Sequence, residues 1–397
     1  MRRALPALLA GLVVLAALVA GIALGGHPDR LPGFLRTALV GDGQTQVVRE
    51  AIDKVHSDYY REIPKNELAD AAITGIVKSL DDRFSNYLSP KDYSHFRDAT
   101  DNAYEGIGMA VVEVKRGLRV ATVYDGTPAK RAGIKRGDII LSAAGKKLAG
   151  KAGRHATDLI KGPPGTTVRL SVLHDGKVRR ISVDRARVTV PVVASALKTR
   201  DGVKLGVVRL ATFSAGAHAE VADALKRLLK KGARGFVFDL RSNGGGLVSE
   251  AQAIGSEFLK GGTIVTTRGR AVPTETLKAI GTPVVPPRDP VVVLVDENTA
   301  SASEIVTGAL QDRHRATVVG THTFGKGVFQ QILDLDNGGA LDLTAGQYFT
   351  PSGRNLGGRG VHTGAGIKPD VHARDNPKTP RDEALVKALG VLAGKLK

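Results

Sequence analysis

A serine and a lysine that lie 25 residues apart could carry out chemistry together. Ser301 stands at the start of a predicted helix, and Lys326 lies between two glycines, which reduce the shielding of its side chain by neighbouring residues. A serine hydroxyl becomes a nucleophile when an adjacent base takes its proton. A lysine amine can be that base only if burial lowers its pKa from about 10.4 toward neutrality. The pair therefore indicates a hydrolase that uses lysine as its base in place of histidine.

Each half of this pair also has a simpler explanation. Ser301 and Glu304 form the pattern of a helix capping box, and Lys326 could be a solvated surface lysine in a chain with 57 Lys and Arg residues. The position of the serine favours the catalytic interpretation, because α/β enzymes place their sites where a strand leads into a helix, and an apolar strand is predicted at 290–295. The N–H of Ala302, at the helix start, could also stabilise an oxyanion.

Gln330 is a candidate partner for the lysine amine. If residues 326–330 are extended, the side chains of Lys326, Val328 and Gln330 face the same side, because side chains alternate along a strand. Gln330 could then orient the amine, which is the role that a third residue plays in catalytic triads.

A glycine-rich loop at 239–246 follows another predicted buried strand. Glycines at the end of a strand can expose backbone N–H groups, which would supply a second oxyanion donor. A phosphate-binding loop and a plain tight turn are alternatives. The phosphate alternative is disfavoured because the loop lacks the Lys-Ser/Thr ending of a P-loop and the spacing of a dinucleotide fingerprint.

The elements that must position these residues begin near Lys204, where apolar strand patterns alternate with helical patterns. The predicted strands lie at 205–209, 235–240, 291–296 and 318–320, and the predicted helices at 217–230, 247–258 and 303–311. This alternation predicts an α/β domain of layered sheet and helices. The charged C-terminus ends in a further helical pattern at 382–396.

The chain before this domain contains two regions with different predicted secondary structure. Residues 45–98 follow helical spacing, with Asn66 as the expected cap of a second helix. Residues 103–187 form a small mixed module, in which Gly and Pro turns separate strands predicted at 108–114, 118–123, 138–143, 167–174 and 178–184.

Together these motifs resemble those of the C-terminal processing peptidases, the tail-specific serine/lysine proteases. The resemblance covers roughly residues 45–372, and its motifs follow the family's order at 80–90, 104–108, 127–134, 137–140, 239–246, 299–305, 323–330 and 348–354. It implies an α/β protease core of layered sheet and helices, with an inserted PDZ domain and an N-terminal helical region. The expected domains are a signal peptide or signal anchor at 1–26, a linker at 27–44, the helical region at 45–102, the PDZ domain at 103–187, the protease core at 188–372, and a C-terminal tail and helix at 373–397.

The resemblance also implies roles for single residues. Ser301 would be the nucleophile, rather than the nearby Ser303, because the spacing to Lys326 matches the family at Ser301. Lys326 would be the general base and Gln330 its orienting partner. The backbone N–H groups of Gly245 and Ala302 would form the oxyanion hole.

In the PDZ domain, the resemblance implies that Gly106, Ile107 and Gly108 receive the substrate's terminal carboxylate through their N–H groups. The extended tail would add a strand to the edge of the sheet. The sequence departs from the usual family pattern at four positions, which are Gly244 for proline, Ala144 for Asp or Asn, Asp82 for proline and Thr299 for serine.

The N-terminus has the pattern of a targeting segment. Arg2 and Arg3 precede an uncharged apolar run at 4–26, which is long enough to cross a bilayer. An uncleaved anchor is favoured slightly over a cleaved signal peptide, and a buried core helix is disfavoured at the extreme terminus. In either targeting interpretation the rest of the chain is exported to the cell envelope, membrane-anchored or secreted.

The amino-acid composition and net charge limit the kinds of partner and site that are expected. The chain of 397 residues has 42% hydrophobic residues and no cysteine, which fits globular domains and excludes disulfides and thiolate sites. Its net charge of +18 is spread along the sequence without a nucleic-acid motif, so no nucleic acid is expected. No metal and no cofactor is expected, because no His, Asp or Glu cluster has ligand spacing. The expected partners are proteins or peptides with accessible C-termini, the membrane, and a second copy of the chain paired through residues 45–98 and 382–396.

The leading hypothesis is therefore a serine endopeptidase that engages protein C-termini and cuts upstream of them. A non-catalytic PDZ scaffold that only captures tails is one alternative. A trypsin-like PDZ protease that uses a histidine such as His155 or His218 is another.

Overall fold

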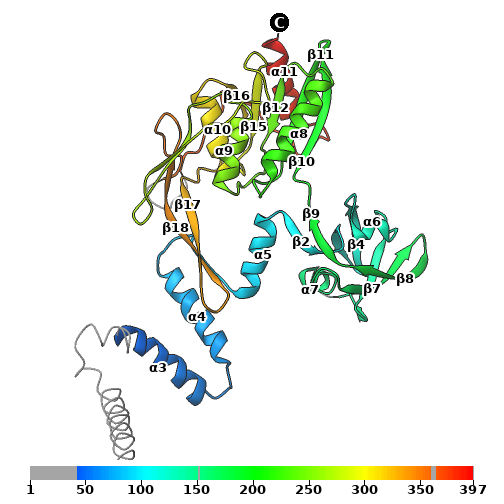
Figure 1. Ribbon diagram of the computed structural model, residues 1–397, viewed down its shortest axis with the longest axis vertical. Coiled ribbons are helices and arrows are strands. Elements are labelled where there is room, and N and C mark those ends of the chain that lie inside the picture. Colours follow the sequence, from blue (N-terminus) through cyan, green and yellow to red (C-terminus); the bar gives the residue numbers. More distant parts are fainter. Residues whose placement is uncertain (1–42, 151–152, 359–363, 397) are drawn as a thin grey trace, which may run out of the picture. The chain divides into compact units, whose positions relative to one another are not determined.

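The computed structural model describes residues 43–150, 153–358 and 364–396 (Figure 1). The chain divides into two compact units, residues 1–81 and 82–397, which are described separately. The targeting segment predicted at 1–26 lies outside the described residues, as does nearly all of the linker predicted at 27–44. Within the described ranges, no helix combines the length and the apolar character needed to span a membrane.

The first unit contains two helices, α3 (Gly43–Asp58) and α4 (Lys65–Lys78). They confirm the helical character predicted for this region, but Asn66 is not the cap, since α4 begins at Lys65 with Pro64 as its N-cap. The α3 helix has no buried residue. Apolar side chains remain exposed on both helices, including Val47, Val55 and Ile76.

The PDZ-like module is an antiparallel sheet in the order β3-β4-β5-β7-β8. Its strands are β3 (Met109–Val114), β4 (Gly117–Val123), β5 (Ile139–Ala143), β7 (Thr167–His174) and β8 (Lys177–Asp184), all close to the predicted ranges, with β6 (Lys146–Lys147) beside β5. Two short helices, α6 (Pro128–Arg131) and α7 (Gly153–Asp158), accompany them. A separate pair, β2 (Ala103–Gly106) and β9 (Ala186–Thr189), joins the two ends of the module. Because β3 is the first strand in the order, its outer edge has no partner strand among the described residues.

The α/β domain is built on a six-stranded sheet in the order β10-β11-β12-β15-β16-β19. Its strands are β10 (Val193–Arg200), β11 (Val203–Leu210), β12 (Phe236–Asp239), β15 (Val291–Val295), β16 (Ala316–Gly320) and β19 (Val371–His372). All neighbours from β11 onward pair in parallel, whereas β10 is antiparallel to β11. The sheet confirms the alternating strand and helix pattern of the sequence.

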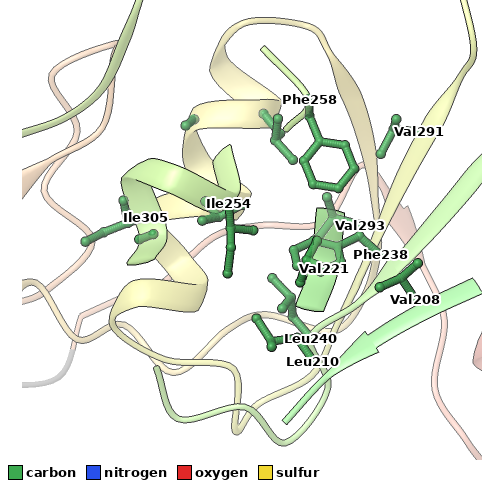
Figure 2. Close-up of a cluster of buried hydrophobic side chains, with 14 of the residues drawn as sticks. Val208, Leu210, Val221, Phe238, Leu240, Ile254, Phe258, Val291, Val293 and Ile305 are labelled. Carbon is green, nitrogen blue, oxygen red and sulfur yellow. The ribbon is translucent and has the colours of Figure 1, made fainter. Parts of the chain in front are cut away.

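The central strands β12 and β15 are buried along their whole length. Since successive side chains of a strand point to opposite sides, the sheet is covered on both faces at its centre. Phe236 and Phe238 pack in a cluster with residues of α8 (Ala217–Lys230), α9 (Val248–Ser256) and α10 (Ala302–Asp312), part of which Figure 2 shows. Val237 lies in a second cluster with α11 (Glu383–Gly394). The predicted C-terminal helix is thus confirmed, and its apolar face is used within its own domain.

A second sheet contains several strands that the sequence did not predict, among them β13, β14 and β18. It runs in the order β1-β18-β13-β14, with β17 also paired to β18. The strands are β1 (Asn86–Leu88), β13 (Thr263–Gly269), β14 (Glu275–Lys278), β17 (Val328–Asp334) and β18 (Ala340–Phe349), and the helix α5 (Pro90–Thr100) follows β1. The long β17–β18 ribbon is orange in Figure 1. Its pairing with β1 brings the segment just after Asp82 beside the lysine region.

Candidate active site

The serine and the glycine-rich loop meet at one edge of the core sheet. Strands β12 and β15 are parallel neighbours, so the segments that follow them emerge at the same edge. The N–H of Ala300 donates to Asn243 O at 3.0 Å, and Thr299 Oγ1 donates to Leu240 O at 2.9 Å. The hydroxyl of Thr299 therefore helps to join the serine segment to the end of β12.

Gly245 lies directly against the serine. A Cβ at this position would lie 2.8 Å from each of Ala300 O, Ala302 N and Ser301 Cβ, and the backbone has a φ of +101°. No other residue type fits this contact without moving the backbone. The replacement of proline by Gly244 in this loop therefore leaves the close approach of Gly245 intact.

The two serines of the segment differ in their access to solvent. Ser301 is half-buried and has a φ of +56°, a conformation that residues other than glycine rarely adopt and that often marks functional sites. Ser303 is fully buried, and its Oγ donates to Asn243 O at 2.9 Å. A buried and engaged hydroxyl cannot meet a substrate, so the geometry favours Ser301 over Ser303.

Lys326 lies in the environment that a neutral amine requires. Its Nζ donates to Gln330 Oε1 at 2.6 Å and lies 5.1 Å from the centre of the Phe84 ring. Burial lowers the pKa of Lys326, and the carboxylates of Asp342, Asp82 and Glu304 oppose this shift in that order. Desolvation is the largest cause, so the structure excludes a freely solvated surface lysine.

The orientation of Gln330 is fixed from the opposite side. Lys326 itself precedes β17 by two residues, but its side chain meets that of Gln330 as expected. Gln330 Nε2 donates to Thr344 Oγ1 at 3.3 Å, and the N–H of Thr344 donates to Ser85 Oγ at 3.0 Å. Ser85 Oγ in turn donates to Asp82 Oδ2 at 2.5 Å. A chain of hydrogen bonds thus runs from the amine to the segment before β1.

Sequence reasoning missed the residues that complete the lysine environment. Phe84, Ser85, Thr344 and Asp342 were not among the candidates, although residues 80–90 belong to the motifs behind the family resemblance. Strand pairing is the reason that they matter, since Asn86 of β1 pairs with Asp342 of β18. That pairing joins positions more than 250 residues apart in the sequence, and local patterns contain no signal for it.

Glu304 connects the serine segment to the lysine segment. Its carboxylate accepts hydrogen bonds from the N–H groups of Ser301 at 3.0 Å, Gly325 at 2.8 Å and Lys326 at 3.0 Å. It also accepts from Thr323 Oγ1 at 2.5 Å. Burial raises the pKa of Glu304, and these donors oppose that rise. The capping residue expected from the sequence therefore positions both candidate catalytic segments.

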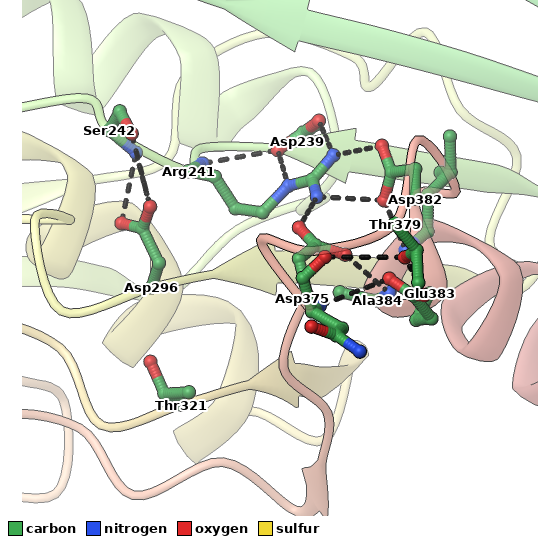
Figure 3. A network of polar contacts seen from close by, with 12 residues as sticks. Asp239, Arg241, Ser242, Asp296, Thr321, Asp375, Thr379, Asp382, Glu383 and Ala384 are labelled. Atoms are coloured by element: carbon green, nitrogen blue, oxygen red, sulfur yellow. Dashed lines mark hydrogen bonds and ion pairs between the residues drawn. The ribbon is translucent and has the colours of Figure 1, made fainter.

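Ion pairs of Arg241 fix the first part of the glycine-rich loop. The guanidinium of Arg241 pairs with Asp239, Asp375 and Asp382, each at 2.8 Å (Figure 3). Two of these carboxylates belong to the C-terminal segment, so this segment ties down the loop beside the serine. The loop is also anchored by Asp296, which accepts from the N–H of Ser242 at 2.9 Å.

The two expected oxyanion donors differ in this structure. Ala302 is the first residue of α10, so its N–H has no acceptor within the helix. The N–H of Gly245 donates to Asn243 Oδ1 at 2.9 Å. To stabilise an oxyanion, this N–H would have to donate to the oxyanion as well as to Asn243 Oδ1, or to leave Asn243 Oδ1 altogether.

Comparisons with known proteins identify the family of this chain. The chain matches the family models described as "Peptidase family S41" over residues 204–373, "PDZ domain" over 106–184 and "Activating protease CtpB N-terminal domain" over 37–91. It is 34% identical to a carboxy-terminal processing protease of Bacillus subtilis over 87% of this chain and 72% of that protein. The chain belongs to peptidase family S41.

Other members of the family are similarly related. A carboxy-terminal-processing protease of Bartonella bacilliformis is 34% identical over 81% of this chain and 73% of that protein. Among solved structures, a photosystem II D1 C-terminal processing protease is 27% identical, with a TM-score of 0.49 over 88% of this chain and 97% of that one. This S41 peptidase is thus a C-terminal processing serine protease with a PDZ domain, which confirms the family, the fold class and the enzyme class predicted from the sequence.

The histidines named in the trypsin-like alternative have other surroundings in the structure. His218 lies at the start of α8, and its Nδ1 is 3.0 Å from a carboxylate oxygen of Glu250. His155 is exposed on α7, within the PDZ domain. The family assignment excludes the trypsin-like fold.

The predicted tail-binding residues form a tight loop between β2 and β3 of the PDZ domain. Gly108 has a φ of +88°, and a Cβ there would lie 2.2 Å from the Cβ of Thr127. Thr127 Oγ1 donates to Gly108 O at 3.1 Å, which fixes the loop's path. The N–H groups of this loop lie beside the unpaired edge of β3, where an added strand would begin.

Proposed function

We propose that Ser301 and Lys326 are the catalytic dyad of this S41 peptidase, with Gln330 as the residue that orients the lysine. The observation that carries the proposal is the half-buried Lys326 amine, which donates a hydrogen bond to Gln330. The backbone N–H of Lys326 shares the Glu304 carboxylate with the backbone N–H of Ser301, which links the two segments. Burial lowers the pKa of Lys326, which increases the share of the neutral, proton-accepting amine at any given pH.

The reaction follows from these positions. Ser301 Oγ attacks the carbonyl carbon of the scissile peptide while Lys326 Nζ takes the hydroxyl proton, and the carbonyl oxygen gains the negative charge. The N–H of Ala302 stabilises this oxyanion. The N–H of Gly245 also does so when it donates to the oxyanion in addition to Asn243 Oδ1. The lysine then gives its proton to the leaving amine, which leaves an ester on Ser301. Water hydrolyses this ester with the same lysine as base.

The PDZ domain supports a preference for substrates with a free C-terminus. The loop of Gly106, Ile107 and Gly108 offers N–H groups to a carboxylate, and the free edge of β3 offers a template for the residues before it. The tail would be captured there while an upstream segment enters the Ser301 site. The substrates are therefore proteins or peptides with accessible, extended C-terminal tails.

Cleavage of an unstructured protein with an apolar tail tests the dyad. Ser301→Ala and Lys326→Ala are each expected to lower kcat by at least about 10³-fold, because a nucleophile and its base act as a unit. Ser303→Ala is the matched control and should retain activity. Unchanged cleavage by either dyad variant would refute the assignment, and tail binding without cleavage by the wild-type protein would favour the scaffold alternative.

Localisation and assembly extend this proposal. The apolar run at 4–26 after Arg2 and Arg3 supports export, with the enzyme anchored to the membrane or secreted. The exposed apolar side chains of α3 and α4 support pairing of two copies through these helices, whereas the apolar face of α11 is already buried in its own domain. Membrane fractionation tests the first point, and light scattering with and without residues 43–78 tests the second.

A further inference from the structure

The tail-binding loop is not vacant, because Tyr104 reaches into it. Met109 is the first residue of β3, and its N–H donates to Tyr104 Oη at 3.1 Å. The same hydroxyl donates back to Met109 O at 3.4 Å. A single phenol thus engages the donor and the acceptor of one residue at the start of an edge strand.

These backbone groups are the ones that an added strand would use. An extended tail pairs with an edge strand by accepting from its N–H groups and donating to its carbonyls. The N–H of Gly108 faces the same phenolic oxygen and, with that of Met109, opposes the rise that burial causes in the pKa of Tyr104. The phenol therefore takes the place of a carboxylate oxygen as acceptor and of a peptide N–H as donor.

The ring of Tyr104 is held over the loop by its neighbours. A Cβ on Gly106 would lie 2.7 Å from the ring, so the glycine allows the ring to lie flat against the loop. The ammonium of Lys161 lies 5.3 Å from the ring centre and 3.7 Å from a carboxylate oxygen of Asp98 on α5. An entering carboxylate would meet both the phenol and this ammonium.

There is space beside the loop into which the ring can turn. A cavity of about 630 Å³ adjoins it, and its lining is largely apolar, including Ala99, Ala103, Ile107, Val111, Ile160 and Val190. A tail residue and a displaced phenol ring are both compatible with such a lining, since each buries an apolar body.

We propose that Tyr104 occupies the carboxylate-binding position of the PDZ loop and that a substrate's C-terminus must displace it, so that this residue sets the affinity threshold for tail recognition. The inference rests on the proposed tail-binding function. An ionised carboxylate forms stronger hydrogen bonds than a neutral phenol, so it can win the exchange. The competition lowers the apparent affinity of every tail by the same factor, the fraction of molecules in which the loop is open.

The experiment measures binding of a fluorescent peptide with an apolar tail to full-length Ser301→Ala protein, which binds without cutting. The peptide is used with a free C-terminal carboxylate and with an amidated end. Tyr104→Phe keeps the ring but removes both hydrogen bonds, and it should tighten binding of the free-acid peptide about 3- to 10-fold, as expected for bonds of about 1 kcal/mol. The ratio of the two peptides' affinities should stay unchanged. Tyr93→Phe, which loses a phenolic bond to Asp334, is the matched control and should bind like the parent.

The outcomes distinguish displacement of Tyr104 from tail binding by the loop. Equal or weaker binding of the free-acid peptide by Tyr104→Phe overturns the displacement, while leaving the tail-binding function intact. A change in the affinity ratio also overturns it, because the phenol would then contact the bound tail. If neither protein binds the free-acid peptide, the tail-binding function fails, and this inference fails with it.

Discussion

The proposed catalytic region and the proposed tail-binding loop of this protein are stabilised in opposite ways. Around Lys326 the polar contacts come from elements far apart in the sequence, namely the 82–88 segment, α10 and β18. Around Gly108 the contacts come from nearby residues such as Tyr104 and Thr127. The first arrangement holds the reacting groups in place before substrate arrives. The second fills a ligand's position with a side chain that local rotation can remove.

Outside the proposed dyad itself, the largest effect is expected where the glycine-rich loop touches the serine segment. Gly245→Ala would place a Cβ against Ala300 O and Ala302 N and force the loop from its φ of +101°. We expect kcat to fall about 10²-fold or more, because loss of one oxyanion donor has this magnitude. Gly353→Ala also carries a positive φ but has open space around it, so it is the control for strain alone. Similar kcat values for the two variants would contradict the prediction.

A smaller effect of another kind is expected in the tail-binding loop. Gly108→Ala would collide with Thr127, so the loop must shift and tail affinity should fall about tenfold. The change should appear in KM for a tailed substrate rather than in kcat, measured by steady-state kinetics. Gly126→Ala, with a φ of +73° and no nearby atoms, provides the comparison. A loss confined to kcat would show that the two regions are not separable.

The hydrogen-bond chain behind the lysine should give a still smaller effect. Thr344→Val removes the acceptor of Gln330 Nε2 and frees the amide to rotate, so kcat should fall about 3- to 10-fold. Thr344→Ser keeps the hydroxyl and should restore most of the activity. KM for the tailed substrate should not change, since the tail site is untouched. Loss of activity in both variants with equally lowered thermal stability would instead indicate a packing role.

The pH dependence should show the smallest change. Asp342 is the largest of the charges that raise the pKa of Lys326 against the effect of burial, and Asp82 and Glu304 also contribute. The neutral amine is the active form, so activity rises with pH through this pKa. Asp342→Asn should lower the pKa further and move the acidic limb of the kcat/KM profile to lower pH. Asp336→Asn, in the exposed turn after β17, should leave the profile in place; a shift to higher pH in Asp342→Asn would contradict the assignment.

Much of the fold could be predicted because its signals are local. The predicted helix at 217–230 coincides with α8, and the strands at 167–174 and 291–296 lie within one residue of β7 and β15. Strands β10, β13, β14 and β18 were missed. Strands β10 and β14 are largely exposed and β18 is half-buried, so their apolar periodicity is weak.

The candidate site divides in the same way. Ser301, Glu304, Lys326 and Gln330 were visible because a capping pattern, a pair of glycines and alternating side chains are properties of neighbouring residues. The sequence also indicated that Lys326 needs burial to act as a base. It could not say what buries the amine, because Phe84, Asp82 and Asp342 approach it only through the pairing of β1 with β18.

By itself, then, the sequence determined the family and predicted candidate catalytic residues and the elements that carry them, since helix starts, strand periods and glycine turns depend on short-range sterics. Only the tertiary structure decided the electrostatic environment of Lys326, the double role of Glu304 and the placement of Tyr104 in the tail-binding loop. These depend on desolvation and on hydrogen bonds whose partners are chosen by how distant segments pack, and no local pattern encodes them.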